Sequence, residues 1–528
     1  MGIKQDMPSR GVAADRLHDY VRLWADTKPQ ADAAIEPGRR LDWAALAAAV
    51  DDCAAALVAQ GVAHGDRVAT LAPPGLDFLV SFLATVSVGA IWVGLNPRYA
   101  DPELDAVLAR IEPKLVLVTP QIEARDYRGW AAALPAKVIV VAFTSDGAEP
   151  GRLRSLQAFL ASGASVEPAR LRRRCREVLP ADPCLIVFTS GSTGTPKGAV
   201  ISHAALVGAS KVQLREWPAE PLRVLDNLPI NHIGCVGDLG CYALVGGGTL
   251  VFTPRFDPEA SLVAIRDERI TVWGQVPTMF QLTLDAPGFE PGMLASLQRV
   301  FWGGAHASSD LLQRLAQVAP RLATSWGQTE TVGSVTFTTP DDGLPALSET
   351  VGRVVPPYAL RIVDSDGNPL EPGGEGEIQV HTPFGMSGYW RDSAATAAVM
   401  AKDGWQRTGD VGMLTPNGRL RLLGRVHDVF KSGGYNIHPP EIEAAIESHP
   451  AIAQAAVVGV ADALYGKVAV AFATCTAAPP SPDALRAHLR ERLANYKVPK
   501  RIVFLDELPR LPVGKVDKQA LREQAESA

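Results

Sequence analysis

The sequence predicts an α/β fold: a large N-terminal domain of layered, mostly parallel sheets plus a β-rich segment, and a small mobile α+β C-terminal domain. Short apolar runs alternate with helical segments through much of the chain, which is typical of parallel sheets covered by helices. Turn residues become frequent from about residue 350, and a compact block follows Arg425. A chain of 528 residues also exceeds the size of one hydrophobic core.

The expected strands of the N-terminal domain are short apolar runs bounded by turn residues. They cover residues 67–72, 90–95, 114–119, 138–143, 184–188, 249–253, 270–276 and 299–304. The uncharged run at 78–95 approaches the length of a membrane span, but Gly89 interrupts it, so we expect a buried helix followed by a strand. A hairpin turn at Asn417-Gly418 is expected in the β-rich segment.

The C-terminal block has its own pattern of elements. We expect helices at 439–449 and 483–496 and strands at 454–460 and 467–475. Ser481-Pro482 has the form of an N-cap followed by proline at the first helical position. The domain boundary is expected near 424–427, which gives domains of residues 1–424 and 425–528.

The composition favours a soluble globular protein of the cytoplasm. Hydrophobic residues make up 47% of the chain and charged residues 20%, and the net charge of −6 gives no global sign of nucleic-acid binding. The basic run at 170–177 is interpreted as a solvated helix face. The six cysteines show no C-x-x-C spacing, and the N-terminus lacks the apolar stretch of a signal peptide.

Residues 188–198, FTSGSTGTPKG, combine glycines, hydroxyl side chains and one lysine. They follow an apolar strand and precede a second apolar run and a helix from residue 203, which Ser202 can cap. Glycines let a ligand approach the backbone, and successive N–H groups in such turns form anion sites. The stretch therefore predicts a polyphosphate-binding loop, to which Lys197 adds a positive charge.

Two other interpretations of this loop are less favourable. In a Walker P-loop counted from Gly191, the second glycine would fall on Pro196, and Lys197 is followed by Gly198 instead of Ser or Thr. A flexible Gly/Ser linker would not lie between an apolar strand and an amphipathic helix.

Five separated motifs in a fixed order resemble the adenylate-forming (AMP-dependent synthetase and ligase) superfamily, and within it the acyl-CoA synthetases. They are FTSGSTGTPKG (188–198), SWGQTE (325–330), RTGD (407–410), the segment from Gly424 to Glu443, and LPVGKVDK (511–518). The resemblance implies that ATP and a carboxylic acid give an acyl adenylate and pyrophosphate, and that the thiol of CoA then displaces AMP. ATP, Mg²⁺ and CoA are the implied cofactors.

The resemblance also implies roles for single residues in the ATP site. The phosphate loop comprises Thr189, Ser190, Gly191, Ser192, Thr193, Gly194, Thr195 and Lys197. Glu330, with Thr193 nearby, would bind Mg²⁺, since hard oxygen ligands suit this ion. Trp326 would stack on adenine, beside Gly327 and Thr329 and opposite Gly304 and Ala305. The family more often has tyrosine at the position of Trp326 and proline at that of His306.

The remaining implied residues lie towards the C-terminus. Asp410 would accept two hydrogen bonds from the ribose diol, Arg425 would reach ribose or phosphate oxygens, and Leu422 would pack near the base. Lys515 would neutralise charge in the adenylation step. Rotation at a hinge, where this chain has His427 instead of the usual Asp or Lys, would then replace Lys515 by a face formed by Lys431, Gly433 and Gly434.

The acyl pocket is less well defined by the sequence. His232, within LPINHIGCVGDLG (228–240), matches a position that gates the substrate carboxylate. Ile233, Val236 and Val335 would form apolar walls, which favour a fatty, alicyclic or aromatic acid. Amino-acid activation is less favoured because the nearest acid, Asp238, lies six positions after His232.

Three functions therefore remain in competition. The leading one is an AMP-forming acyl-CoA synthetase acting on an apolar fatty, alicyclic or aromatic acid, so its partners would be a small-molecule carboxylic acid, ATP and CoA. The others are a ligase that transfers the acyl group to a carrier protein or another acceptor, and a non-catalytic nucleotide-binding protein. The sequence determines neither the acid nor the oligomeric state, for which a homodimer is one option, and it indicates no nucleic-acid partner and no transmembrane segment.

Overall fold

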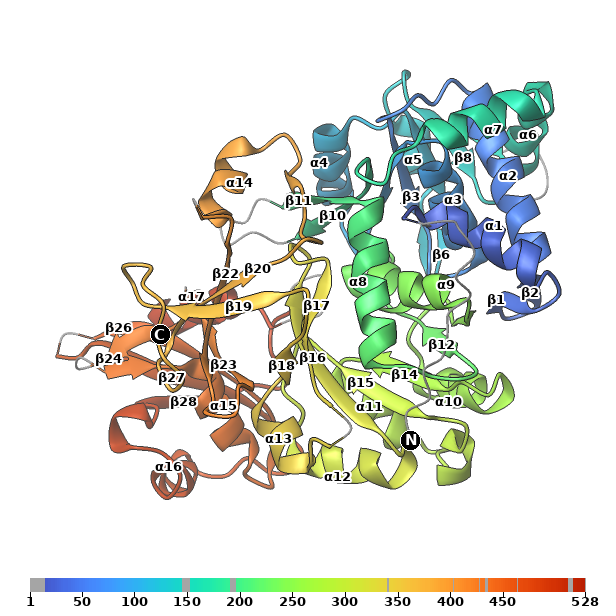
Figure 1. The fold of residues 1–528 in the computed structure, drawn as a ribbon. Coiled ribbons are helices and arrows are strands. Elements are labelled where there is room, and N and C mark those ends of the chain that lie inside the picture. The colour runs from blue at the N-terminus through green and yellow to red at the C-terminus, as the bar shows by residue number, and fades with distance from the viewer. Residues whose placement is uncertain are drawn as a thin grey trace. The chain divides into compact units, whose positions relative to one another are not determined.

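The computed structural model describes residues 15–144, 152–189, 196–339, 341–401, 403–426, 428–432, 435–462, 464–510 and 516–527. The chain packs as two compact units: residues up to 342 together with 382–398, and residues 343–381 together with 399–528. Figure 1 labels helices and strands of both. The predicted α/β class is confirmed. These units do not coincide with the domains expected from the sequence, whose boundary lies near 424–427. That residues 425–528 move as a separate domain stays a prediction.

The first sheet of the first unit has the strand order β21-β11-β10-β4-β3-β5-β8-β9. Its strands are β3 (Arg67–Leu71), β4 (Ile91–Gly94), β5 (Leu115–Val118), β8 (Ile139–Ala142), β9 (Arg154–Ser155), β10 (Pro183–Thr189), β11 (Lys197–Ser202) and β21 (Gly388–Tyr389). The strands from β10 to β9 run parallel, whereas β11 is antiparallel to both β10 and β21. The phosphate-loop segment thus joins two antiparallel strands at one side of a parallel sheet.

The second sheet contains, within the first unit, the order β17-β16-β15-β14-β12-β13-β1-β2. Its strands are β1 (Asp32–Glu36), β2 (Arg39–Asp42), β12 (Arg223–Asp226), β13 (Thr249–Phe252), β14 (Val272–Gln275), β15 (Arg299–Trp302), β16 (Leu322–Gln328) and β17 (Gly333–Phe337). From β16 to β1 the strands are parallel, and β17 and β2 are antiparallel additions. A two-stranded ribbon of β6 (Gln121–Ile122) and β7 (Arg125–Asp126) lies outside both sheets.

Helices connect these strands. They are α1 (Leu17–Thr27), α2 (Trp43–Ala59), α3 (Leu76–Ser87), α4 (Asp101–Ile111), α5 (Arg128–Ala133), α6 (Leu156–Ser162), α7 (Pro168–Glu177), α8 (His203–Glu216), the π-helix η2 (Gly234–Cys241), α9 (Tyr242–Gly246), α10 (Pro258–Asp267), α11 (Pro277–Leu284), α12 (Ser309–Val318) and α14 (Ser393–Val399). Ser202 caps α8 by accepting a hydrogen bond from the Ala205 N–H, as predicted. The helix α3 ends just before Gly89, whose φ of 75° marks the expected break. Among the described residues, no helix is both long and apolar enough to cross a membrane.

The second unit contains the predicted β-rich segment. Its antiparallel sheet has the order β19-β20-β22-β23, formed by β19 (Ala359–Val363), β20 (Gly376–His381), β22 (Gln406–Leu414) and β23 (Leu420–Arg425). The expected hairpin at Asn417-Gly418 joins β22 to β23, and Gly418 has a φ of 75°. The helix α13 (Leu344–Glu349) and the short strand β18 (Arg353–Val354) precede this sheet along the chain.

The C-terminal block follows the predicted pattern with shorter helices. Its sheet has the order β25-β24-β27-β26, with β28 beside β27. The elements are β24 (Phe430–Ser432), β25 (Tyr435–Ile437), α15 (Pro439–Glu447), β26 (Ile452–Asp462), β27 (Gly466–Cys475), α16 (Pro482–Arg490), β28 (Arg501–Phe504) and α17 (Lys518–Ser527). Ser481 caps α16, as expected, although this helix ends at Arg490 and not at residue 496.

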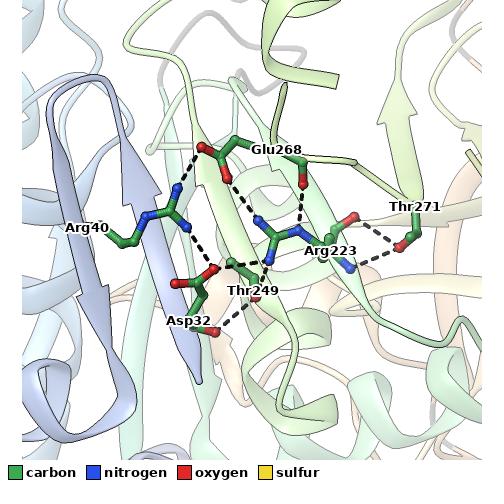
Figure 2. Close-up of polar contacts among 6 residues, drawn as sticks. All are labelled: Asp32, Arg40, Arg223, Thr249, Glu268 and Thr271. Carbon is green, nitrogen blue, oxygen red and sulfur yellow. Dashed lines mark hydrogen bonds and ion pairs between the residues drawn. The ribbon is translucent and has the colours of Figure 1, made fainter. Parts of the chain in front are cut away.

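A charged network ties strand ends of the second sheet together, as Figure 2 shows. Arg223, at the start of β12, contacts Asp32 of β1 at 3.3 Å and Glu268 at 2.9 Å. Arg40 of β2 binds the same two carboxylates at 2.7 and 2.8 Å. The Arg223 N–H also donates to the Thr271 hydroxyl at 2.9 Å. Each carboxylate thus meets two guanidinium groups, and the network links β1, β2, β12 and the residue that follows α10.

The two arginines differ mainly in burial, because the Arg223 side chain is 17% exposed and that of Arg40 is 48% exposed. We expect Arg223→Met to lower the free energy of unfolding by roughly 2–3 kcal/mol, since it leaves two partly buried carboxylates with one cation. Arg40→Met should cost less than about 1 kcal/mol, as solvent screens the exposed pair. Urea denaturation of both variants checks this, and equal losses would contradict it.

Candidate functional site

The ends of the predicted phosphate loop lie next to each other on paired strands. Thr189 is the last residue of β10, and Lys197, the first residue of β11, is its partner in the antiparallel register. The residues between them that were predicted to bind phosphate lie outside the described residues: Ser190, Gly191, Ser192, Thr193, Gly194 and Thr195. Their roles stay predictions, while the strand register fixes where the loop begins and ends.

Glu330 lies beside this loop. It follows β16, in the connection to β17, and its Oε1 accepts a hydrogen bond from the Thr189 hydroxyl at 3.4 Å. Thr189 lies 141 residues earlier in the chain. The structure therefore brings together two residues that the sequence assigned to separate motifs, and it places a half-buried carboxylate at the mouth of the loop. Carboxylate and hydroxyl oxygens are donors that suit Mg²⁺, so this set fits the predicted ion.

Tyr389 is a site residue that the sequence analysis missed. Its hydroxyl donates to Oε1 of Glu330 at 2.8 Å, and its ring lies 5.5 Å from the Lys197 ammonium. Burial, followed by the nearby Glu330, raises the pKa of Tyr389 above its ordinary value, so the phenol stays protonated and remains a donor. The Tyr389 side chain thus contacts both Glu330 and Lys197, the anionic and the cationic residue of the predicted phosphate site.

The backbone around Tyr389 holds the same two regions together. The Met386 N–H donates to the Glu330 carbonyl at 3.0 Å, and the Trp390 N–H donates to the Gly198 carbonyl at 2.7 Å. Between them, β21 pairs with β11. The segment from Met386 to Trp390 is therefore bonded on one side to the Glu330 turn and on the other to the strand that leaves the phosphate loop.

The residues predicted around adenine follow neighbouring parallel strands. Gly304 and Ala305 come after β15, while Trp326 and Gly327 end β16. A side-chain carbon at Gly303 would lie 3.7 Å from the Ser325 carbonyl, so the two segments are adjacent. Ligands of open α/β sheets bind at such carboxyl ends of strands. Trp326 is 6% exposed and Thr329, after β16, is 7% exposed, so both are largely buried; the stacking role of Trp326 stays a prediction.

The second unit holds the predicted ribose residues. Asp410 of β22 and Arg425 of β23 are register partners, and Arg425 Nε lies 2.7 Å from Asp410 Oδ1. The Asp410 side chain is 9% exposed and that of Arg425 is 52% exposed, so a buried carboxylate is held by a solvent-facing guanidinium. Leu422, on the same strand as Arg425, is also exposed. The structure thus joins Asp410 and Arg425, whereas their contacts with ATP stay predictions.

The predicted residues of the domain movement are only partly described. Lys431, in β24, is exposed. Lys515, His427, Gly433 and Gly434 lie outside the described residues. Their assigned roles in adenylation, hinge movement and CoA binding stay predictions.

The expected acyl segment forms a π-helix, which the sequence analysis did not predict. His232 is exposed just before this helix, and its Nδ1 accepts a hydrogen bond from the Gly234 N–H at 3.0 Å. The predicted wall residues Ile233, Val236 and Val335 are all buried. π-Helices occur often at functional sites. The geometry therefore agrees with an apolar lining near an accessible histidine, while the role of His232 stays a prediction.

A phosphate-loop register, a carboxylate beside it and a ligand edge of parallel strands are features expected of an enzyme that binds a phosphorylated nucleotide. The family described as AMP-binding enzyme matches residues 21–390, and its C-terminal domain matches residues 441–515. The chain belongs to this family of adenylate-forming enzymes. The predicted family is thereby confirmed.

Individual relatives cover nearly all of the chain. The indoleacetate–CoA ligase of Aromatoleum aromaticum is 37% identical over 96% of this chain and 98% of its own length. A feruloyl-CoA synthase from an Amycolatopsis species is 34% identical over 94% of this chain and 96% of its own. The solved structure of the amide bond synthetase McbA from Marinactinospora thermotolerans is 31% identical, with a TM-score of 0.85 over 97% of this chain and 100% of that one. The CoA ligases among these relatives confirm the predicted class of AMP-forming acid–thiol ligase. CoA ligases of this family use ATP, Mg²⁺ and CoA, as predicted.

Tyr389→Phe tests the contact with Glu330, because it keeps the ring and removes only the hydroxyl. We expect kcat/KM for ATP to fall about 10-fold to 100-fold and the Mg²⁺ requirement to rise, since a hydrogen bond to a charged group is worth about 1.5–3 kcal/mol. Steady-state kinetics at several Mg²⁺ concentrations measure this. Tyr242→Phe is the control, because that hydroxyl donates to the Trp217 carbonyl in the same unit. An unchanged Mg²⁺ requirement in Tyr389→Phe would contradict the role.

Proposed function

We propose that this protein is an AMP-forming acyl-CoA ligase that activates an apolar carboxylic acid, with an aromatic acid as the best supported class. The observation that carries the proposal is the placement of Glu330 against Thr189 and Tyr389, at the end of the phosphate loop. ATP and a carboxylic acid are both anionic, so catalysis requires their alignment and charge neutralisation instead of a covalent nucleophile.

In the proposed first step, the substrate carboxylate forms a bond to the α-phosphorus of ATP, and pyrophosphate leaves. Lys197 and the loop residues from Thr189 to Thr195 would hold the phosphates, and Glu330 with Thr193 would hold Mg²⁺, which neutralises phosphate charge when bound. Lys515 would stabilise the developing charge between carboxylate and phosphate.

In the proposed second step, the CoA thiol attacks the acyl carbon of the adenylate, and AMP leaves. Rotation of the C-terminal part would exchange Lys515 for Lys431, Gly433 and Gly434 between the two steps. Lys515 should therefore matter for adenylation and little for thioester formation. A cytoplasmic location and a homodimer remain predictions from the sequence.

The aromatic class of substrate rests on two supports. The residues expected to line the acyl pocket are buried apolar side chains, and the buried aromatic residue Trp302 ends β15. The two CoA ligases compared above are named for indoleacetate and ferulate, which are both acids with an aromatic ring. An aromatic ring against such walls would gain binding free energy from buried apolar area.

Release of pyrophosphate and AMP over a panel of fatty, alicyclic and aromatic acids, with and without CoA, tests this function. We expect one class of acid to support AMP formation that depends on CoA. Lys515→Ala should slow pyrophosphate release by about 100-fold or more. AMP formation that ignores CoA but responds to an amine or a carrier protein would indicate another acceptor. No release from any acid would contradict the proposal and favour a nucleotide-binding protein without this activity.

A further inference from the structure

A carboxylate lies inside the first unit in a place where the sequence analysis expected apolar walls. Asp238 is on the π-helix η2 and lines a small cavity together with Leu206 and Gln213 of α8 and Val332 and Ser334 of the β16–β17 hairpin. Asp238 lies below the surface but keeps an accessible edge, because it faces this cavity. Burying a carboxylate costs free energy unless hydrogen-bond donors compensate for the lost water.

The surroundings of Asp238 leave its carboxylate with acceptor capacity. The Ser334 N–H donates to the carboxylate, whose Oδ1 lies so close to Gly333 that a side-chain carbon there would be 2.5 Å away. Gln213 instead donates its Nε2–H to the Asp238 backbone carbonyl at 3.0 Å. None of the described residues that line the cavity is basic. Burial raises the pKa of Asp238 to about 7, so its ionised form, which can only accept hydrogen bonds, predominates above that pH.

Two of the segments that line the cavity also carry residues predicted to act in catalysis. Val332 and Ser334 follow Glu330 directly in the hairpin connection, and Gly237 and Asp238 follow His232 through η2. The segment predicted to gate the acid and the segment that carries the predicted Mg²⁺ ligand therefore meet at this polar cavity. A group that entered from the acid site and ended here would meet an acceptor, and not an apolar wall.

We propose that Asp238 is a specificity-determining residue that accepts a hydrogen bond from an N–H or O–H group at the distal end of the acyl substrate. The inference rests on the proposed CoA ligase function and deepens it. The preferred acids would be aromatic or alicyclic acids that carry such a donor away from the carboxylate. A methylene or methoxy group at the same place would leave the remaining acceptor positions of Asp238 without a donor, and sites built around a hydrogen bond reject analogues that lack the donor.

Two pairs of acids test this inference, because in each pair one member has the donor hydrogen and the other has a methyl group in its place. They are 4-hydroxycinnamic and 4-methoxycinnamic acid for O–H, and indole-3-acetic and 1-methylindole-3-acetic acid for N–H. We expect kcat/KM for CoA-dependent AMP formation to favour the donor by about 10-fold to 100-fold in at least one pair. The pair that shows the preference identifies the donor as O–H or N–H.

Asp238→Asn is the decisive variant because it keeps the shape and an acceptor for the Ser334 N–H but turns an amide N–H towards the substrate. The preference should fall below about 3-fold or reverse towards the methylated acid, since two donors would then face each other. Asp238→Leu, which has no acceptor in its side chain, should likewise lose the preference between the two members of that pair.

Asp226→Asn is the matched control. Asp226 is fully buried, accepts hydrogen bonds from the Leu228 N–H and the Cys235 thiol, and does not line the cavity. Its replacement should lower the melting temperature without changing the preference within either pair. Melting temperatures of all variants separate loss of folding from loss of specificity.

Three results would overturn the inference. In the first, the wild-type kcat/KM is equal for both members of each pair or higher for the methylated acid. In the second, Asp238→Asn lowers kcat/KM equally for both members of the preferred pair. In the third, the enzyme turns over fatty acids alone. If no acid of any class gives CoA-dependent AMP formation, the proposed function fails as well. The two failures are thus distinguishable, because the first leaves a CoA ligase with another specificity.

Discussion

The hydrogen bond from the Tyr389 hydroxyl to Glu330 is the interaction on which the rest of the first unit's site depends. Each partner comes from a different part of the chain, 59 residues apart. Glu330 in turn accepts from Thr189, so three segments meet at one carboxylate oxygen. Because backbone hydrogen bonds flank Tyr389 on both sides, the carboxylate is positioned by a surrounding frame and not by its own flexible turn.

This arrangement explains how a parallel sheet can hold a highly charged substrate. The parallel strands end at one edge, where the Trp326 segment and the Gly304 segment lie next to each other. The antiparallel pair β10–β11 supplies the phosphate loop, and β21 extends that pair by one more strand. The described residues of the predicted phosphate and adenine sites therefore lie either on strands or next to a strand end. Fixed polar groups of this kind stabilise developing charge without having to reorganise during the reaction.

The second unit supplies a contrasting arrangement. Asp410 is held by Arg425, and this pair lies on two adjacent strands whose register fixes its geometry. The carboxylate is buried, so its position is held by the surrounding residues. The guanidinium is exposed, so Arg425 is freer to move and to bind another anion. We infer that Asp410 is the fixed member of the predicted ribose site and Arg425 the adaptable one.

Local features of the fold could be predicted from the sequence, whereas contacts between distant segments could not. The caps at Ser202 and Ser481 and the break at Gly89 depend on neighbouring residues, and they were predicted correctly. The order of the motifs led to the predicted roles of Glu330 and Asp410, which stay predictions. Tyr389 has no local signal, since its function arises only when its short strand pairs with β11.

The π-helix also lacked a recognisable pattern. Its glycines at 234, 237 and 240 disfavour a helix by propensity, so tertiary packing decides the conformation. Because the helix was not expected, Asp238 could not be placed at a cavity from its distance in sequence to His232. The polar end of the predicted acyl site was therefore hidden from sequence reasoning.

The most direct test of the account is the exchange of label between pyrophosphate and ATP, measured with a carboxylic acid and Mg²⁺ but without CoA. If adenylation occurs at the site around Glu330, exchange will require the acid, and Glu330→Gln will lower its rate by about 100-fold or more. Exchange that proceeds without any acid, or at the same rate in Glu330→Gln as in the wild-type enzyme, would contradict the account.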